Sequence, residues 1–469
     1  MPNPAAPPPS APAPTTTPTP ALAPSPASPS SPPPPRASDR PLACPECSGP
    51  LDPDPRFTAW CPECEWNLVP AEEAAEETAK SAKVLARERA AAERTERLFR
   101  DVSAGRADTT RRDWLAASAL AVPVHLVTVA VAGAGLWLLV TGNTPLRCLG
   151  ALLLAVAFLL RPQLGRAPKD AGVLTRSQAP ALYGLADRVA AELGAPPVGV
   201  IRVDEEFNAT MGAVGLRRTS VLTIGLPFWE TLDDQQRVAV LGHEIAHRIN
   251  GDNRRGLWLG SAMGALAHWY DLSRPRERVT GGYGVVALLT LIGDHIGNAF
   301  LHVISQLPYR TYLLLERLTA RAGQQAEYRA DELGARAGSS EAAHGVLVAT
   351  LLRPATWTVT SRLRAEMQSR PRSGRRDAAQ GPGADALWPQ LREHLATIPP
   401  LERERLLRRS RRAGHVVDAS HPPTHLRLAL LAQRAPLPAS VICPPDEAAA
   451  IAAELAPHRT RIARALLAG

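Results

Sequence analysis

The chain has 469 residues, six cysteines and a formal net charge of +8. Six cysteines are too few for a disulfide scaffold of this length, and a hydrophobic fraction of 45% is ordinary for a globular protein. The basic balance admits either nucleic acid or an anionic membrane as a partner. Because the arginines flank apolar segments, we expect a lipid bilayer and no nucleic acid. The N-terminus has no basic-then-apolar pattern, so we expect no cleaved secretory leader.

Residues 1–40 consist mainly of Pro, Ala, Ser and Thr, without periodic apolar positions. Such a segment cannot bury enough surface to offset the entropy of ordering, so we predict that it is disordered. Residues 71–112 are rich in strong helix formers, with Glu early and Arg late, and we predict a charged, solvated helical stalk. A partner-binding coiled coil is the alternative, although the heptad pattern is weak.

Two CPEC motifs lie in the segment 41–70, which separates the tail from the stalk. Their cysteines are Cys44, Cys47, Cys61 and Cys64. Four thiolates at this spacing are typical of a tetrahedral structural zinc site, and we predict a zinc ribbon. Redox pairing of the cysteines is the alternative, which a cytoplasmic setting disfavours. The acidic residues of this segment favour contact with protein over contact with nucleic acid.

The block 113–161 is predicted to be a transmembrane helical hairpin. Its first apolar run, 114–140, would extend roughly 40 Å as a helix, enough to cross a hydrocarbon core of about 30 Å. The second run, 146–160, is shorter. Arginines flank the outer ends of the hairpin and the turn at 141–145 is uncharged. The positive-inside rule therefore places both flanks on the cytoplasmic side of the cell (inner) membrane. A buried helical hairpin of a soluble protein is the alternative.

A globular domain is predicted from 170 to 435, followed by a C-terminal helical segment at 436–469. Helices are expected at 178–193 and 232–249, and short strands at 198–203 and 220–225. Two further apolar stretches, 256–270 and 284–307, are predicted to be helices of this domain that rest on the membrane surface. The second stretch contains Asp294, and a charge inside a bilayer is costly. The expected fold class is α+β, mainly helical, with a small antiparallel sheet.

The segment VLGHEIAHRINGD places His243 and His247 four residues apart on a predicted helix, so both imidazoles lie on one face and can reach one ion. A catalytic zinc takes such ligands and keeps one position open for water. Glu244, beside the first histidine, can then accept a proton from that water. The alternative is a chance HExxH match on a surface helix, which the apolar side of this helix disfavours.

The segment QAEYRADELGA supplies a candidate third ligand. Glu327 and Asp331 lie four residues apart on another predicted helix. We predict that Glu327 completes the ligand set and that Asp331 orients a ligand histidine by a hydrogen bond. An exposed acidic pair on a helix is the alternative.

HEIAH together with EYRAD resembles the membrane-associated zinc metallopeptidases of the CAAX prenyl endopeptidase and HtpX-like family. The resemblance covers 170–435 and extends to FNATMGAVGLRRTSVLTIGL and SHPPTHLRLALL. It implies a zincin-type metallopeptidase domain whose zinc ligands are His243, His247 and Glu327, with Glu244 as the general base.

The same resemblance implies the parts that hold a substrate. Asn208 and Ala209 would lie near a substrate-binding edge strand. His421 and Arg427 would contact the substrate or the developing oxyanion. Thr210 stands where many members of the family have an aromatic residue.

The function expected from these features is hydrolysis of peptide bonds in protein or peptide substrates, mainly membrane proteins. Two zinc ions are expected, one catalytic and one structural. The alternative function is a catalytically degenerate membrane adaptor that recruits a protein partner through its zinc ribbon.

Overall fold

The computed structural model describes residues 42–70, 81–106, 111–162, 165–215, 217–249, 256–275, 285–369, 384, 386–412 and 421–468. The predicted disordered tail, 1–40, and the first part of the predicted stalk, 71–80, lie outside these residues. The described part of the chain is mainly helical, with small sheets, as expected for this fold class.

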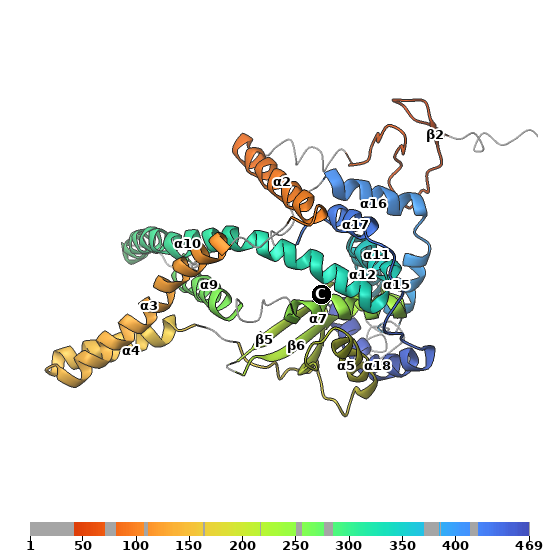
Figure 1. The fold of residues 1–469 in the computed structure, drawn as a ribbon. Helices are drawn as coiled ribbons and strands as arrows, with labels where there is room; N and C mark the ends of the chain where they lie inside the picture. The colour runs from red at the N-terminus through yellow and green to blue at the C-terminus, as the bar shows by residue number, and fades with distance from the viewer. Residues whose placement is uncertain are drawn as a thin grey trace, which may run out of the picture.

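A four-stranded sheet in the order β3-β4-β6-β5 lies under the helices of the predicted domain (Figure 1). Its strands are β3 (Val173–Leu174), β4 (Val200–Asp204), β5 (Ala209–Val214) and β6 (Thr219–Gly225). The sheet is mixed and not purely antiparallel as expected, because β4 and β6 pair in parallel. The chain runs back along β5, which pairs antiparallel with β6, so β6 returns in the direction of β4.

The main hydrophobic core lies between this sheet and two helices, α5 (Pro180–Glu192) and α7 (Asp234–Ile249). The inward side chains of β6 and α7 are almost completely buried, among them Leu222, Ile224, Leu241 and Ile245. Asp233 caps the N-terminus of α7, since its Oδ1 accepts a hydrogen bond of 2.7 Å from the backbone N–H of Gln236. The predicted surface alternative for the HExxH helix is therefore excluded by the burial of α7.

The C-terminal part of the chain surrounds this core. Its helices are α11 (Ser340–Thr350), α12 (Arg353–Ser369), α15 (Leu387–Ala396), α16 (Pro400–Arg412), α17 (Thr424–Gln433) and α18 (Pro445–Ala468). The predicted C-terminal segment is joined to the domain, because Ile451, Leu455 and Ile462 of α18 belong to the main core. Glu454 also accepts backbone N–H groups at the start of α5, at 2.7 and 3.0 Å.

One helix, α10 (Val285–Gly338), extends from the core to a second group of helices (Figure 1). That group contains α3 (Arg111–Thr141), α4 (Thr144–Leu160), a short π-helical turn (Gly256–Gly260) and α9 (Ser261–Ser273). A second hydrophobic cluster joins α3, α9 and α10 through residues such as Ala121, Leu266 and Leu315. The two stretches predicted as separate helices of the domain thus lie beside α3 and away from the sheet.

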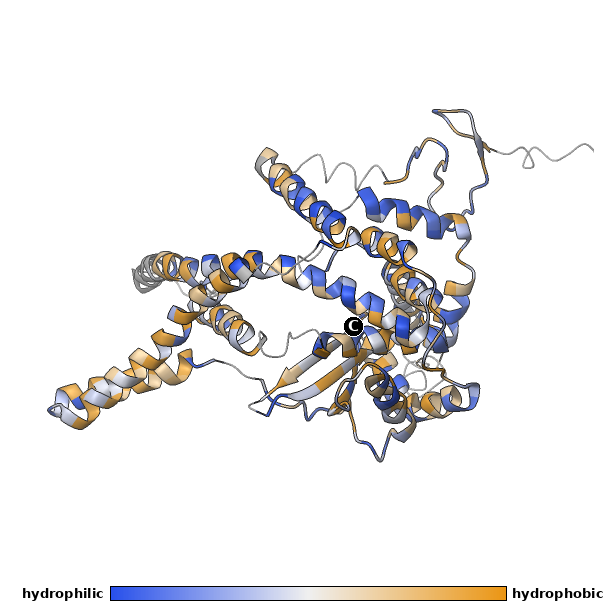
Figure 2. Ribbon diagram, in the orientation of Figure 1, coloured by the Kyte–Doolittle hydropathy of each residue, from blue (hydrophilic) through white to orange (hydrophobic). Residues whose placement is uncertain are grey.

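The helices α3 and α4 form an antiparallel apolar hairpin, which is mostly orange in Figure 2. Their backbones approach closely where Gly135 meets Gly150, so that a Cβ on either glycine would clash with the other helix. Among the described residues, one helical segment is long and apolar enough to cross a membrane, Arg112–Thr141, with 30 residues. The helix α4 is apolar but shorter.

The N-terminal part of the chain packs on the C-terminal helices. A two-stranded sheet, β1 (Leu42–Ala43) and β2 (Pro50–Leu51), belongs to the cysteine-rich segment, and α2 (Ala82–Ser103) follows it. A fully solvated stalk was expected, but Thr95 and Leu98 of α2 are buried and the helix contacts α10 and α17. Thr95 and Leu98 are three residues apart and therefore lie on one face of the helix, which tertiary packing covers.

Candidate active site

Small residues allow α7 and α10 to pack closely. A Cβ added to Gly242 would lie 2.8 Å from the Cβ of Ala337 and 3.1 Å from the Cα of Gly334. A Cβ on Gly338 would likewise meet the backbone of Ala239. Only a residue without a side chain fits at such a close approach. This contact brings the histidines of α7 next to the carboxylates of α10.

The three predicted ligands of the catalytic zinc lie together. The Nε2 atoms of His243 and His247 are 3.3 Å apart. Glu327 approaches each imidazole with a different oxygen, at 3.5 Å from His243 Nε2 and 3.4 Å from His247 Nε2. Nitrogen and oxygen ligands about 2.0–2.1 Å from a tetrahedral zinc are separated by about 3.3–3.4 Å. The spacing and chemistry of the donor set therefore fit a zinc ion.

The electrostatics of the site favour a cation between these side chains. Burial alone would lower the pKa of His243, but hydrogen bonds to Asp331 and Glu327 overcome it and raise this pKa to about 10. The two carboxylates thus hold a proton on His243 when no metal compensates them. Burial lowers the pKa of His247 to about 4, so its imidazole is neutral at physiological pH.

Asp331, the predicted orienting residue, lies against His243. Its Oδ1 lies 3.0 Å from His243 Nδ1, on the side of the ring opposite to Glu327. Arg427 of α17 forms a bidentate ion pair with the same carboxylate, with Nη2–Oδ1 2.6 Å and Nε–Oδ2 2.7 Å. Burial opposes the ionisation of Asp331, but the charge of Arg427 outweighs it and holds the pKa of Asp331 below its usual value. Asp331 therefore remains a carboxylate that can orient the histidine.

The proposed general base, Glu244, is buried in α7 beside the ligand histidine, with 7% of its surface exposed. Burial raises the pKa of its carboxyl to about 7. A carboxyl with a pKa near neutrality is suited to accept and return a proton.

The late His-Pro segment also reaches the site. His421 is half exposed, and its Nδ1 lies 2.7 Å from Glu327 Oε2. Arg427 lies 3.6 Å from the same oxygen, while its guanidinium is held by Asp331. Contact of these two residues with a substrate or an oxyanion stays a prediction.

Asn208 and Ala209 lie where β5 begins, at the edge of the sheet nearest α7. The carbonyl oxygen of Asn208 accepts a hydrogen bond of 2.8 Å from the N–H of Gly225, and its side chain accepts one of 2.9 Å from the N–H of Ala209. In the described part of the chain, β5 pairs with β6 only, so its other edge offers unpaired backbone groups. Their use in substrate binding stays a prediction.

Two features of the site were not anticipated from the sequence. The ion pair between Asp331 and Arg427 joins residues far apart in the chain, for which the sequence carries no signal. The close packing of α7 on α10 does have a sequence signal, because Gly334 and Gly338 are one helical turn apart and lie on one helix face.

The four cysteines of the N-terminal segment form a second candidate metal site. The sulfur atoms of Cys44 and Cys64 are 3.6 Å apart, and those of Cys47 and Cys61 are 3.5 Å apart. A disulfide would require about 2.05 Å. Thiolates about 2.3 Å from a tetrahedral zinc are separated by about 3.8 Å, so the cluster fits zinc and not redox pairing.

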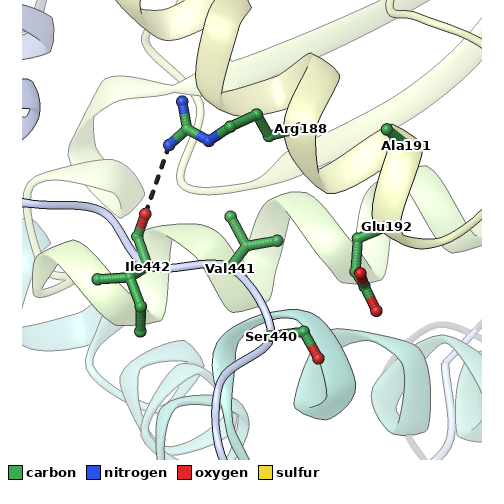
Figure 3. Close-up of a pocket in the computed structure, with 6 residues that line it drawn as sticks. All are labelled: Arg188, Ala191, Glu192, Ser440, Val441 and Ile442. Atoms are coloured by element: carbon green, nitrogen blue, oxygen red, sulfur yellow. Dashed lines mark hydrogen bonds between the residues drawn. The ribbon is translucent and has the colours of Figure 1, made fainter.

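A pocket on another face of the molecule contains none of these residues (Figure 3). It lies between α5 and the segment before α18, where Arg188 donates a hydrogen bond of 3.4 Å to the carbonyl oxygen of Ile442. We assign it no part in the chemistry of the site.

The central region of the chain is similar to known proteins. Residues 177–435 match peptidase family M48. The chain is 28% identical over 165 residues to a protein named Protease HtpX homolog from Pyrobaculum calidifontis, which covers 35% of this chain and 44% of that relative. It is 28% identical over 227 residues to Protease HtpX from Xanthomonas axonopodis pv. citri, which covers 44% of this chain and 74% of that relative. The chain thus spans less than half of the first relative.

No solved structure matches the chain significantly. The family match contains all the candidate residues of the His–His–Glu site, from Asn208 to Arg427. The cysteine-rich segment, α2, α3 and α4 lie before it.

Proposed function

This chain belongs to peptidase family M48, and from that premise we propose that it is a membrane-anchored zinc endopeptidase with Glu244 as its general base. The observation that carries the proposal is the spacing of 3.3–3.5 Å between the donor atoms of His243, His247 and Glu327. These atoms come from two helices that glycine contacts hold together, so the arrangement is part of the fold.

The metal would be held by the two imidazoles and the Glu327 carboxylate. When bound, zinc polarises a carbonyl group and makes a water molecule more acidic. Glu244 adjoins His243 on α7 and is shielded from solvent, so its carboxylate can accept the proton of an attacking water and return it to the leaving amine. Asp331 keeps the ring of His243 in place, and Arg427 keeps Asp331 charged.

The free edge of β5 is the proposed binding site of the substrate. A peptide could pair with this edge as a further strand and expose its main chain to α7, because backbone hydrogen bonds need no particular side chain. Asn208 and Ala209 stand at the start of this edge. His421, half exposed beside Glu327, would approach the same peptide.

The hairpin of α3 and α4 is the proposed membrane anchor. Large apolar side chains on its surface are exposed, including Trp137, Val140 and Phe158. Such a patch on a monomer indicates contact with lipid or another protein. The arginines at both outer ends of the hairpin favour a multi-pass chain with its catalytic domain at the cytoplasmic face. The substrates proposed from this location are membrane proteins and proteins close to the membrane.

The full chain purified in detergent should cleave casein or a membrane-protein substrate. Glu244→Gln, which keeps the shape of the side chain but cannot accept the proton, should reduce kcat by about 10²–10⁴-fold. Glu341→Gln, at the exposed start of α11, is the matched control and should retain activity. Cleavage that resists both Glu244→Gln and a chelator would exclude the proposed function.

Metal analysis separates this proposal from a degenerate adaptor. The peptidase proposal expects zinc at both clusters, the His–His–Glu site and the four cysteines. An adaptor that keeps only its ribbon would hold metal at the cysteines alone. A total zinc content that is unchanged by His243→Ala and abolished by Cys44→Ser would therefore favour the adaptor, whereas the peptidase proposal expects each change to remove about half of the zinc.

A further inference from the structure

The cysteine-rich segment, residues 42–70, is attached to α16. Three arginines of this helix donate hydrogen bonds to it: Arg405 Nη1 to Leu68 O (3.2 Å), Arg408 Nη1 to Pro62 O (2.5 Å) and Arg412 Nη2 to Glu65 Oε2 (2.7 Å). We call these three arginines the ribbon dock. The acidic character of the segment, which the sequence indicated, is thus met by a basic helix of the same chain.

The ribbon dock is buried at Arg405, partly buried at Arg408 and exposed at Arg412. Arg405 is only 5% exposed and is held by Glu402 at 2.7 Å. The guanidinium of Arg408 lies 5.3 Å from the ring centroid of Trp60, a cation–π geometry. Phe57 packs against the main core beside His394 of α15. The buried hydrogen bond of Arg405, with the ring contacts of Trp60 and Phe57, attaches the ribbon to α16 and to the main core.

The helix that carries the ribbon dock also contacts the helix that carries Arg427. Leu406 and Leu407 of α16 pack against the main core, which includes Leu428 and Leu431 of α17. Arg412 is separated by only eight residues of chain from His421. A displacement of α16 would therefore be transmitted to α17.

The helix α2, which follows the ribbon in the chain, contacts α17 as well. It also touches α10 close to the zinc ligand. The ring of Phe99 lies 6.3 Å from that of Tyr328, which adjoins Glu327, and Asp101 pairs with Arg321 at 3.2 Å. Both N-terminal elements thus support the helices from which Arg427 and Glu327 project.

We propose that the ribbon is an intramolecular positioning element: held on α16 by the ribbon dock, it keeps α17 where Arg427 supports Asp331. Arg408 is then a positioning residue for the active site. Release of the ribbon frees one side of α16, and α17 opens more often, because local opening depends on how much buried contact an element has. The inference extends the proposed peptidase function, but its first test needs no substrate.

The test is hydrogen exchange of the full chain with Arg408→Glu. This change removes the bond to Pro62 and the contact with Trp60, and it places a carboxylate beside Glu65. Exchange at residues 424–433 should become about tenfold faster, while exchange in α5 stays unchanged. Arg411→Glu is the matched control, because Arg411 is exposed on the same helix and has no ribbon contact among the described residues. Arg408→Lys, which keeps the charge, should give an intermediate rate.

Activity provides a second readout. Because Arg427 acts through Asp331 on His243, Arg408→Glu should lower kcat by about tenfold, the smaller effect typical of residues outside the ligand set, with KM nearly unchanged. Cys61→Ser with Cys64→Ser disrupts the ribbon without altering α16 and should give the same two changes. If wild-type chain cleaves no substrate yet exchange at 424–433 responds, the peptidase proposal fails and the positioning inference stands.

Two results would overturn the inference. In the first, both the Arg408 and the cysteine variants leave exchange at 424–433 at the wild-type rate, which would make the ribbon an independent module. In the second, exchange rises equally in α5 and α17, which would show a general contribution to stability and no specific action on α17.

Discussion

Asp331 connects three parts of the molecule through a single carboxylate. It faces His243 of α7 at 3.0 Å and is itself held on both oxygens by Arg427 of α17. If zinc is bound, a neutral His243 that donates its Nδ1–H to Asp331 would have the lone pair of Nε2 available for the metal. The orientation of one proposed zinc ligand would therefore depend on Arg427, a residue near the C-terminal end of the domain.

Asp331→Asn is expected to weaken zinc binding at the His–His–Glu site by about 10–100-fold. The amide retains the size of the side chain but lacks the charge that pairs with Arg427 and stabilises the imidazole tautomer. The dissociation constant of zinc can be measured by competition with a chelator. A Glu327→Ala chain, which should not retain zinc at this site, shows which part of the bound zinc belongs to it.

Asp446→Asn is the control for this change, because Asp446 is exposed in the first turn of α18. In Asp331→Asn alone, zinc binding can weaken because His243 loses its carboxylate partner or because Arg427 is left as an unpaired buried charge. The double variant Asp331→Asn with Arg427→Gln removes the second cause and leaves the first. Zinc affinity equal to that of the wild type in Asp331→Asn would contradict the assigned role.

At the scale of elements, the site depends on how closely α7 and α10 approach. Gly242 faces Ala337 and Gly334, and Ala239 faces Gly338. The helix α10 is 54 residues long and would extend about 80 Å if straight. Its last turns carry Glu327 and Asp331, and its earlier turns lie beside α3, so one continuous helix joins the site to the apolar helices.

Gly242→Ala should destabilise the fold by about 1–3 kcal/mol, because the new methyl group has no room between the helices and their backbones must separate. The separation should also weaken zinc binding by moving Glu327 away from the histidines. Thermal unfolding in detergent and metal content of the purified chain would measure the two effects.

Gly184→Ala on α5 is the matched control. A Cβ at this position meets nothing within 4 Å, and alanine is favoured over glycine in a helix by about 0.5–1 kcal/mol. The two glycine substitutions should thus shift the unfolding temperature in opposite directions. A stabilised Gly242→Ala chain would show that the packing of α7 on α10 is looser than described.

At the scale of the whole molecule, polar and apolar regions are separated. The two candidate metal sites belong to the four-stranded sheet's domain and to the N-terminal cysteine-rich segment. The apolar helices α3, α4 and α9 extend away from the sheet (Figure 2). Exposed side chains on α10, including Phe300, Val303 and Leu307, add to the apolar surface of the hairpin. The arrangement suits a chain whose catalytic part lies beside a bilayer.

The topology can be tested with single cysteines placed in a chain that carries Cys148→Ser. A membrane-impermeant maleimide applied from outside should label Thr144→Cys in the hairpin turn and should not label Ser273→Cys at the end of α9. The arginines that follow α9 in the sequence disfavour an outside location for that loop. Labelling of Ser273→Cys from outside would show that α9 and the first half of α10 also cross the membrane.

Local sequence determined the chemistry of this protein. Ligands four residues apart on a helix share one face in any fold, so His243 with His247, and Glu327 with Asp331, could be paired without a structure. The two CPEC motifs likewise predicted a zinc ribbon, and the long apolar run predicted a membrane-spanning helix. These features depend on helix period, ligand chemistry and length, which neighbouring residues decide.

Tertiary structure alone decided how these parts meet. Three features depend on contacts between distant segments. These are the parallel pairing of β4 with β6, the burial of α2, and the continuation of the predicted helix at 284–307 into the helix that carries Glu327, which together form α10. The Asp331–Arg427 pair joins residues of α10 and α17 that are 96 positions apart, and the ribbon dock joins α16 to the N-terminal cysteine-rich segment. Local sequence has no signal for either contact. From sequence alone a charged helix is expected to be solvated, because its packing partners lie elsewhere in the chain. For this reason α2, expected to be a solvated stalk, proves to lie against α10 and α17.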